Sequence, residues 1–145
     1  MNERAVRAAL QHYIDYSSAG DEDRASEIYL EDAVLEFPQS GERFEGVENF
    51  REWRRIYPAD VTLEIVRVQG EGDHWVVEIR ARYEDGPWLY GPAIYEFRDG
   101  KVARETIYVA EGWEAPEWRA QWRAAPPRAS QSGPSNQPPA GASGA

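Results

Sequence analysis

The chain of 145 residues contains no cysteine, which excludes disulfide bridges, zinc–thiolate sites, iron–sulfur clusters and thiol nucleophiles. Basic residues are few: 16 Lys and Arg stand against 26 Asp and Glu, so the net charge is −10. This balance argues against nucleic acid as a partner. No apolar run reaches membrane-spanning length, and no apolar stretch like that of a signal peptide follows Met1. We therefore expect a cytoplasmic protein with no membrane partner.

Metal-binding and phosphate-binding patterns are missing as well. His12 and His74 lie far apart and belong to no His-x-x-x-His or His-Glu pair. The acidic run from Asp21 to Asp23 lacks the ligand spacing and the glycine of a calcium loop, and it is better interpreted as the start of a helix. Neither a phosphate-cradling glycine loop nor a Ser–His–Asp order is found. We expect no metal and no cofactor.

Aromatic residues, in contrast, are abundant, and all six Trp and eight Tyr precede residue 125. From Ala125 to Ala145 the composition shifts to Pro, Ala, Ser and Gly, without one large apolar side chain. Such a segment cannot bury enough apolar surface to offset the entropy of ordering it. We predict one folded domain over residues 1–124 and a disordered tail over residues 125–145.

The first third of the chain has the 3.6-residue period of helices. Apolar side chains at helical spacing over residues 6–17 predict a first helix that stops at Gly20. Asp21 is a suitable N-cap for a second helix, and a third is expected from Gly46 to Pro58. Between the second and third helices, residues 33–37 are typical of a short strand.

From residue 61 the period changes to two, which is typical of strands. Turn sequences such as Asp85-Gly86 and Asp99-Gly100 separate the alternating runs. The predicted strands are residues 61–68, 75–83, 88–97 and 101–109. Helices followed by hairpin-linked strands indicate the α+β class, with three N-terminal helices packed on a strongly curved antiparallel sheet.

Several segments together resemble the NTF2-like superfamily in its SnoaL-like branch, over about residues 3–123. The segments are Tyr13–Asp21, Tyr29–Glu36, Phe44–Gly46, Tyr95–Val102 and Glu114–Arg119. The resemblance implies a cone-shaped roll with a deep, mostly apolar pocket. Members of this superfamily include steroid isomerases, polyketide cyclases, epoxide hydrolases and binding proteins without catalysis, so the fold alone does not give the function.

The resemblance also implies roles for particular positions. In the ketosteroid-isomerase pattern, Tyr13 occupies the place of an oxyanion donor, and the second donor falls at Tyr95 or, with a slip of two residues, at Ala93. The general base of that pattern falls on Phe37, whose ring cannot accept a proton. In the epoxide-hydrolase pattern, the aspartate that activates water falls on Ile107. Both acid constellations are therefore incomplete, and Tyr13 can equally be a tyrosine of the core.

One acid remains a candidate for catalysis. Glu105 shares its strand face with Ile107 and Val109, which we expect to point into the cone. Desolvation of a carboxyl favours its neutral form and is a common route to acid–base chemistry near neutral pH. The alternative is that Glu105 pairs with Arg80 or Arg82 across the sheet.

The aromatic excess predicts a pocket for a small hydrophobic molecule. The expected lining residues are Tyr29, Phe37, Trp53, Tyr57, Trp75, Tyr83, Ile107 and Val109. A homodimer interface is the competing use of aromatic residues, and the segment from Trp113 through Trp118 to Trp122 fits an interface or a pocket lid.

Two hypotheses for the function follow. One is a cofactor-independent acid–base enzyme of the isomerase, cyclase or hydrolase type, in which Glu105 moves a proton while Tyr13 and Tyr95 hold the oxygen of a hydrophobic cyclic substrate. The other is a non-catalytic ligand-binding or homodimeric interaction domain.

Overall fold

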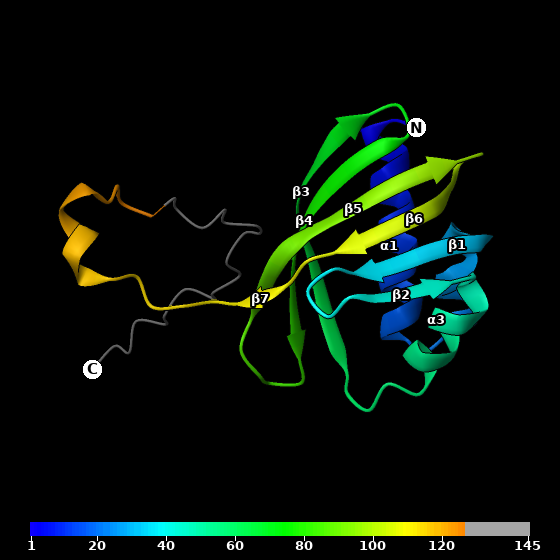
Figure 1. The fold of residues 1–145 in the computed structure, drawn as a ribbon, viewed down its shortest axis with the longest axis horizontal. Helices are drawn as coiled ribbons and strands as arrows, with labels where there is room; N and C mark the ends of the chain where they lie inside the picture. Colours follow the sequence, from blue (N-terminus) through cyan, green and yellow to red (C-terminus); the bar gives the residue numbers. More distant parts are fainter. Residues whose placement is uncertain (127–145) are drawn as a thin grey trace, which may run out of the picture. The chain divides into compact units, whose positions relative to one another are not determined.

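The computed structural model describes residues 1–126, so residues 127–145 of the predicted tail lie outside the described part. Its contacts divide the chain into two units, Met1–Trp113 and a second that begins at Glu114. The first unit holds nearly all of the secondary structure (Figure 1). Its elements are α1 (Glu3–Ser18), α2 (Glu22–Ala25), the 3-10 helix η1 (Ser26–Ile28), β1 (Tyr29–Phe37), β2 (Glu42–Glu45), α3 (Val47–Arg55), β3 (Val61–Glu71), β4 (His74–Tyr83), β5 (Leu89–Arg98), β6 (Lys101–Ile107) and β7 (Ala110–Glu111).

The strands form one curved sheet in the order β2-β1-β6-β5-β4-β3, and β7 pairs with β5 (Figure 1). Strands β3 to β6 form an antiparallel meander, as the alternating pattern predicted. A register shift between Ile65 and Arg67 marks a bulge in β3. It breaks the alternation near the end of that strand, so Val66 is exposed while Val68 is buried.

The helix starts follow the local sequence. The Asn2 side chain accepts a hydrogen bond from the backbone N–H of Ala5 at 2.9 Å, and Asp21 accepts one from Arg24 at 3.1 Å. Gly46 precedes α3 with a φ of 87°, a left-handed conformation that favours glycine. The expected N-cap at Asp21 and the helix start at Gly46 are confirmed.

The core lies between the inner face of the sheet and the helices α1 and α3. Its buried members are Val6, Leu10, Ile28, Tyr29, Ala33, Leu35, Phe50, Val68, Trp75, Val77, Ala93, Tyr95, Phe97 and Val102. Phe50 of α3 and Leu35 of β1 are the largest side chains that are fully enclosed. The helices therefore close one face of the sheet, and the core contains polar aromatic rings as well as aliphatic ones.

The α+β class is confirmed, and so is the curved sheet covered by helices. The three predicted helices correspond to α1, to α2 with η1, and to α3. Two features of the sheet were not predicted. β1 begins at Tyr29 and pairs in parallel with β6, and the short β2 pairs with β1. β1 thus carries Tyr29 into the centre of the molecule.

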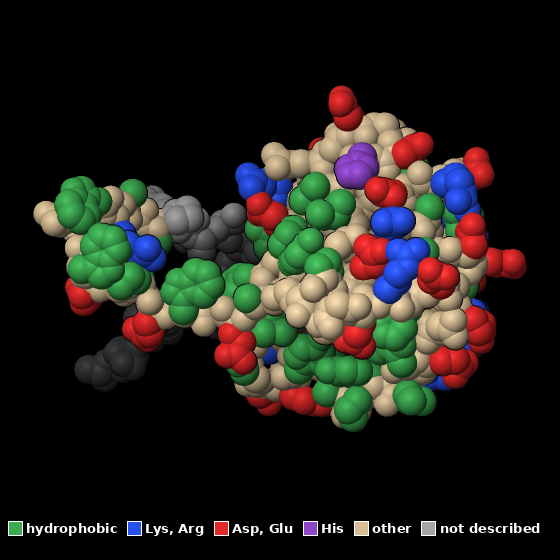
Figure 2. Space-filling model, viewed as in Figure 1, with side chains coloured by type: hydrophobic (Ala, Val, Ile, Leu, Met, Phe, Trp, Pro, Cys, Tyr) green, Lys and Arg blue, Asp and Glu red, His purple; other side chains and the backbone are tan. Residues whose placement is uncertain are grey.

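Charged side chains cover much of the surface, where Asp and Glu outnumber Lys and Arg (Figure 2). Many are paired, for example Arg98 with Asp32 at 2.6 Å. Within residues 1–126, no helix is long and apolar enough to cross a membrane.

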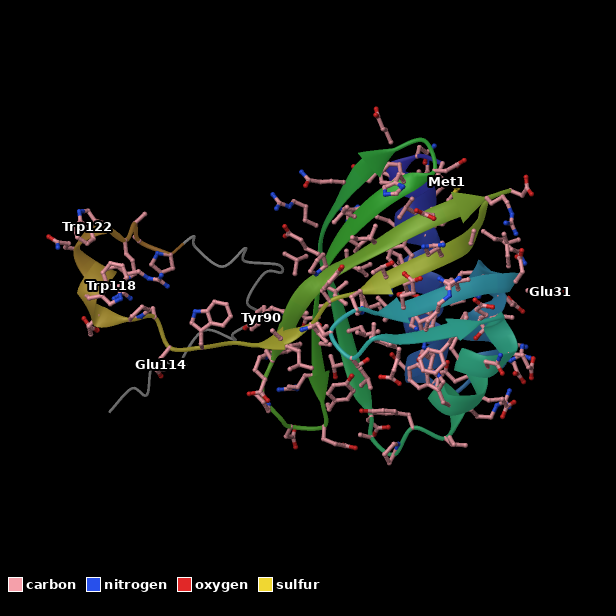
Figure 3. The ribbon with its side chains drawn as sticks, viewed as in Figure 1. Met1, Glu31, Tyr90, Glu114, Trp118 and Trp122 are labelled. Carbon is pink, nitrogen blue, oxygen red and sulfur yellow. The ribbon has the colours of Figure 1, made fainter. Side chains whose placement is uncertain are left out.

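In the described residues of the second unit, 114–126, there is one short element, the 3-10 helix η2 (Glu117–Trp122). Trp118 and Trp122 project from it (Figure 3), and their exposed fractions are 73% and 71%. A role of this segment as an interface or lid stays a prediction.

Candidate functional site

The most deeply buried acid of the domain is Glu105, which is 4% exposed. It lies in the middle of β6, with Tyr95 opposite it on β5 and Leu35 opposite it on β1. Alternation places its side chain on the inner face of the sheet, as the strand parity predicted. A buried carboxylate costs several kcal/mol unless it is hydrogen-bonded and paired, so its partners decide what it can do.

Both carboxylate oxygens of Glu105 accept hydrogen bonds from phenols. The Tyr29 hydroxyl donates to Oε2 at 2.5 Å, and the Tyr95 hydroxyl donates to Oε1 at 2.8 Å. Tyr29 enters from the start of β1, whereas Tyr95 is the direct cross-strand neighbour. The two donors therefore fix the carboxylate from two different strands.

The positive partner of this carboxylate is Arg54, near the end of α3. Its Nη2 lies 3.6 Å from Glu105 Oε2, and its Nη1 donates to the Tyr29 hydroxyl at 3.1 Å. The two side chains are only 10% and 5% exposed. Arg54 also stacks on aromatic rings, with its Cζ 5.1 Å from the centroid of Tyr13 and 5.6 Å from that of Trp53. We call Glu105, Tyr29, Tyr95 and Arg54 the buried network.

Burial is the main cause of the pKa shifts of the two phenols, Tyr29 and Tyr95. Desolvation raises the pKa of Tyr29 and of Tyr95 well above the ordinary value, and the negative charge of Glu105 raises both further. Arg54 opposes these effects without cancelling them. Both phenols are therefore neutral donors at physiological pH.

Tyr13, predicted as an oxyanion donor, lies beside the network. Its ring centroid is 6.3 Å from that of Tyr29, and its pKa is raised, mainly by burial. Among the hydrogen bonds of the described residues, none joins Tyr13 to Glu105. The structure thus brings Glu105 and Tyr95 into direct contact, whereas Tyr13 packs against Tyr29 and Arg54 without contacting the carboxylate through a hydrogen bond.

The alternative interpretation of Glu105, a pair with Arg80 or Arg82, is wrong, because its partner is Arg54. Arg80 pairs with Glu64 at 2.5 Å. Both arginines also lie over the ring of Trp88, with Cζ at 4.3 and 5.0 Å from its centroid. The physical reason is strand parity: even-numbered residues of β4 face away from the core that contains Glu105.

Arg54 was not among the residues predicted for the site. The spacing of residues on α3 could have indicated it, because Arg54 lies four residues after Phe50 and therefore on the same helix face. Phe50 is fully buried, so an arginine at that spacing is placed at the edge of the core. A buried arginine in turn requires an acidic partner, and Glu105 provides it.

A separate cavity of about 630 Å³ lies beside the turn between β1 and β2. Hydrophobic side chains gather at the surface in this part of the molecule (Figure 2). The cavity is open to solvent, and its lining residues are Phe37, Gln39, Ser40, Glu42, Phe44, Trp53, Tyr57, Tyr83 and Val109. We call it the aromatic cavity, because five of these nine side chains are aromatic rings.

The five rings of the aromatic cavity form a continuous chain of contacts. Successive centroids are 5.5 to 6.5 Å apart, from Phe37 through Phe44 and Trp53 to Tyr57 and Tyr83. No pair is parallel, since the interplanar angles run from 39° to 84°. The rings therefore line the open cavity at several different orientations.

Gln39 holds the rim of the aromatic cavity in place. Its side-chain Nε2 donates to the carbonyl oxygen of Val109 at 2.7 Å, and its Oε1 accepts from the N–H of Val109 at 2.8 Å. This pair of bonds joins the β1–β2 turn to the segment after β6.

Five of the eight predicted pocket residues line the aromatic cavity: Phe37, Trp53, Tyr57, Tyr83 and Val109. The other three lie elsewhere. Tyr29 belongs to the buried network, and Trp75 is 5% exposed within the core, where its indole donates to the carbonyl of Gly72 at 3.0 Å. Ile107 packs against the core.

A second hollow of about 660 Å³ lies between α1 and β3. It is lined by Arg7, Ala8, Gln11, Ile14, Leu63, Glu64 and Ile65. No aromatic ring and none of the predicted pocket residues contributes to its wall. It is less suited than the aromatic cavity to hold a flat apolar molecule.

Metal ligands do not gather in the part of the chain that the structure describes, where no group of three or more His, Asp and Glu side chains could hold an ion. His12 instead contacts the carbonyl oxygen of Arg24 through Nε2 at 2.8 Å. Asp21 caps α2, as expected.

Comparisons with known proteins show similarity in sequence and in fold. A family model for the SnoaL-like domain matches residues 10–105. An NTF2-like protein of unknown function from Burkholderia xenovorans LB400 is 40% identical, with 88% of this chain and 99% of that one covered and a TM-score of 0.78. A protein from Kribbella flavida DSM 17836, solved as a "putative ketosteroid isomerase", is 27% identical over 86% and 91% of the two chains, with a TM-score of 0.72.

A more distant structure shares the fold alone. An LEH-like epoxide hydrolase from M. tuberculosis is 19% identical, with 73% of this chain and 82% of that one covered and a TM-score of 0.63. No curated protein sequence matches the chain.

Proposed function

The chain belongs to the SnoaL-like domain family of the NTF2-like superfamily, and we propose that it binds a hydrophobic, ring-containing small molecule in the aromatic cavity. The observation that carries this proposal is the wall of five contiguous rings around about 630 Å³. Ligand sites in proteins have this size and lining, with a few polar groups that fix the orientation of the ligand. Here the polar groups are Gln39, Ser40, Glu42 and the hydroxyls of Tyr57 and Tyr83.

The geometry favours binding over catalysis by Glu105. A general acid or base must come within hydrogen-bond reach of the group it serves. Glu105 does not line the aromatic cavity, and both of its oxygens already accept phenol hydrogen bonds. An enzymatic role for Glu105 requires that a substrate reach this buried carboxylate, either beside Tyr29 and Tyr95 or in place of one of them.

The network has a structural role in this proposal. It ties β1, β5 and β6 to α3, because Tyr29, Tyr95, Glu105 and Arg54 come from these four elements. Trp53 precedes Arg54 on α3 and forms part of the cavity wall. Fixing Arg54 therefore also fixes the helix that presents Trp53 to the ligand.

Steroid-isomerase chemistry has no base at the position that the family pattern requires. Phe37 stands there, and its ring packs 6.1 Å from Trp53 and 6.4 Å from Phe44. Phe37 therefore forms part of the wall of the aromatic cavity. The isomerase activity named for the Kribbella protein is therefore not part of our proposal.

The test uses 4-tert-butylphenol as the probe and the full chain, with two variants of matched chemistry. Tyr83→Ala removes a ring from the cavity wall, whereas Tyr108→Ala removes a ring of similar exposure, 39% against 38%, that does not line it. We expect the probe to raise the melting temperature of the unchanged chain and of Tyr108→Ala, with a weaker effect on Tyr83→Ala. A bound ligand at one hundred times its dissociation constant adds about 2.7 kcal/mol, which corresponds to several degrees. Equal shifts in both variants, or none in any protein, contradict the proposal.

A homodimer is the second part of the proposal. The outward face of the sheet carries Val76 and Tyr90, which are 39% and 50% exposed, near the ring of Trp88 between Arg80 and Arg82. Tyr, Trp and Arg are the residue types that interfaces favour. Light scattering of the full chain is expected to give twice the chain mass, and Val76→Glu to return the chain mass. A monomer at all concentrations contradicts this part.

A further inference from the structure

The charged side chain that lines the aromatic cavity is acidic. Of its nine lining residues Glu42 is the charged one, and no Lys, Arg or His contributes to the wall. Glu42 Oε1 accepts a hydrogen bond from the Ser40 hydroxyl at 2.7 Å. Among the described residues, no hydrogen bond involves its second oxygen, Oε2. The rim therefore offers a carboxylate with a free acceptor.

The arginines that are neighbours of the wall in the sequence are engaged elsewhere. Arg43, next to Glu42, pairs with Glu36 and Glu45. Arg54, next to Trp53, belongs to the buried network, and Arg82, next to Tyr83, lies over the Trp88 ring. An anionic ligand in this cavity would face Glu42 with no cation on the wall to compensate it.

Aromatic rings attract cations through the negative charge density on their faces. Five contiguous, non-parallel rings line the cavity, and one of them, Trp53, already contacts a cation, since the Arg54 Cζ lies 5.6 Å from its centroid. The net charge of −10 adds a long-range field of the same sign. Rings, rim carboxylate and overall field all favour positive charge in the ligand.

We propose that the aromatic cavity takes a cationic ligand, a hydrophobic molecule that carries a quaternary or protonated amine. The amine lies among the rings of Trp53, Tyr57 and Tyr83 with Glu42 as its counter-charge. This inference rests on the proposed function and adds the ligand's charge to it.

The test compares three probes of one shape that differ in charge, each titrated into the full chain by NMR with the Trp53 indole N–H as the reporter. The probes are (4-hydroxyphenyl)trimethylammonium, 4-tert-butylphenol and 4-hydroxybenzenesulfonate, which are cationic, neutral and anionic. We expect the cation to bind about tenfold more tightly than the neutral probe, a difference of about 1.4 kcal/mol, and the anion to bind most weakly.

Matched variants locate the effect. Glu42→Gln is expected to reduce the preference for the cation over 4-tert-butylphenol to about threefold, because it removes the counter-charge. Glu45→Gln is the control, because Glu45 lies on the same strand, pairs with Arg43 and does not line the cavity. It is expected to leave the preference unchanged.

The outcomes separate this inference from the proposal on which it rests. If 4-tert-butylphenol binds as tightly as the cation, the cationic ligand is ruled out and the proposed function stands. If Glu45→Gln lowers the preference as much as Glu42→Gln, the overall field is responsible and the inferred site is wrong. If no probe binds, the inference and the proposed function fail together.

Discussion

Replacing Glu105 by glutamine keeps the size of the side chain and removes its charge. In the folded protein this leaves the Arg54 guanidinium, 10% exposed, without its counter-charge. Breaking a buried ion pair in this way costs about 3–5 kcal/mol, and solvent screens little at this depth. The amide of Gln accepts from one phenol through its oxygen, but its NH₂ group then faces the second phenol oxygen. We therefore expect Glu105→Gln to lower the free energy of unfolding by about 4 kcal/mol.

The assay is equilibrium unfolding in urea, followed by tryptophan fluorescence. Glu96→Gln is the control, since Glu96 is 46% exposed and pairs with Arg104 at 3.5 Å on the outer face. It is expected to cost less than about 1 kcal/mol. A double-mutant cycle with Arg54→Met is expected to show that the two losses are not additive, because the second change removes the charge that the first left unpaired. A loss below about 1 kcal/mol for Glu105→Gln, or strict additivity, refutes the structural role of the network.

Further predictions concern pH and backbone packing. Burial raises the pKa of Tyr13, Tyr29 and Tyr95 above the ordinary 10.0, so the unfolded chain loses these protons first as the pH rises. The free energy of unfolding is therefore expected to be steady below about pH 9.5 and to fall above about pH 10, and the fall is expected to be shallower in Tyr29→Phe. Urea unfolding over this pH range tests the prediction. A free energy that does not change with pH contradicts it. A Cβ on Gly91 would lie 1.7 Å from the carbonyl oxygen of Tyr108, so Gly91→Ala is expected to cost roughly 3 kcal/mol or more. Gly112→Ala meets only the movable Tyr90 ring at 3.1 Å and is expected to cost less; equal losses in the melting temperature of the two variants contradict this.

The meander could be predicted from the sequence because each of its strands alternates and ends at a turn. The pair of β1 and β6 could not, since parallel pairing joins residues about seventy positions apart, such as Leu35 and Glu105, and leaves no local pattern. β2 could not be predicted for a different reason. Glu42–Glu45 is four residues long with three exposed side chains, so it has no hydrophobic period to detect.

The candidate site was predictable in part. Parity placed Glu105 inside, and the aromatic count pointed to a ring-lined cavity, of which five members were foreseen. Which buried tyrosine meets which acid depends on how β1 crosses the sheet, and this contact between Tyr29 and Glu105 spans 76 positions. The sequence therefore indicated the types of side chain in the core and could not indicate their partners.

A crystal structure of the full chain with bound (4-hydroxyphenyl)trimethylammonium tests the central claim most directly. The account predicts that the probe lies among Trp53, Tyr57 and Tyr83 with its charge near Glu42. The hydrogen bonds from Tyr29 and Tyr95 to Glu105 are then unchanged. A probe bound against Glu105, with either phenol displaced, would contradict the account and return Glu105 to the role of a catalytic acid or base.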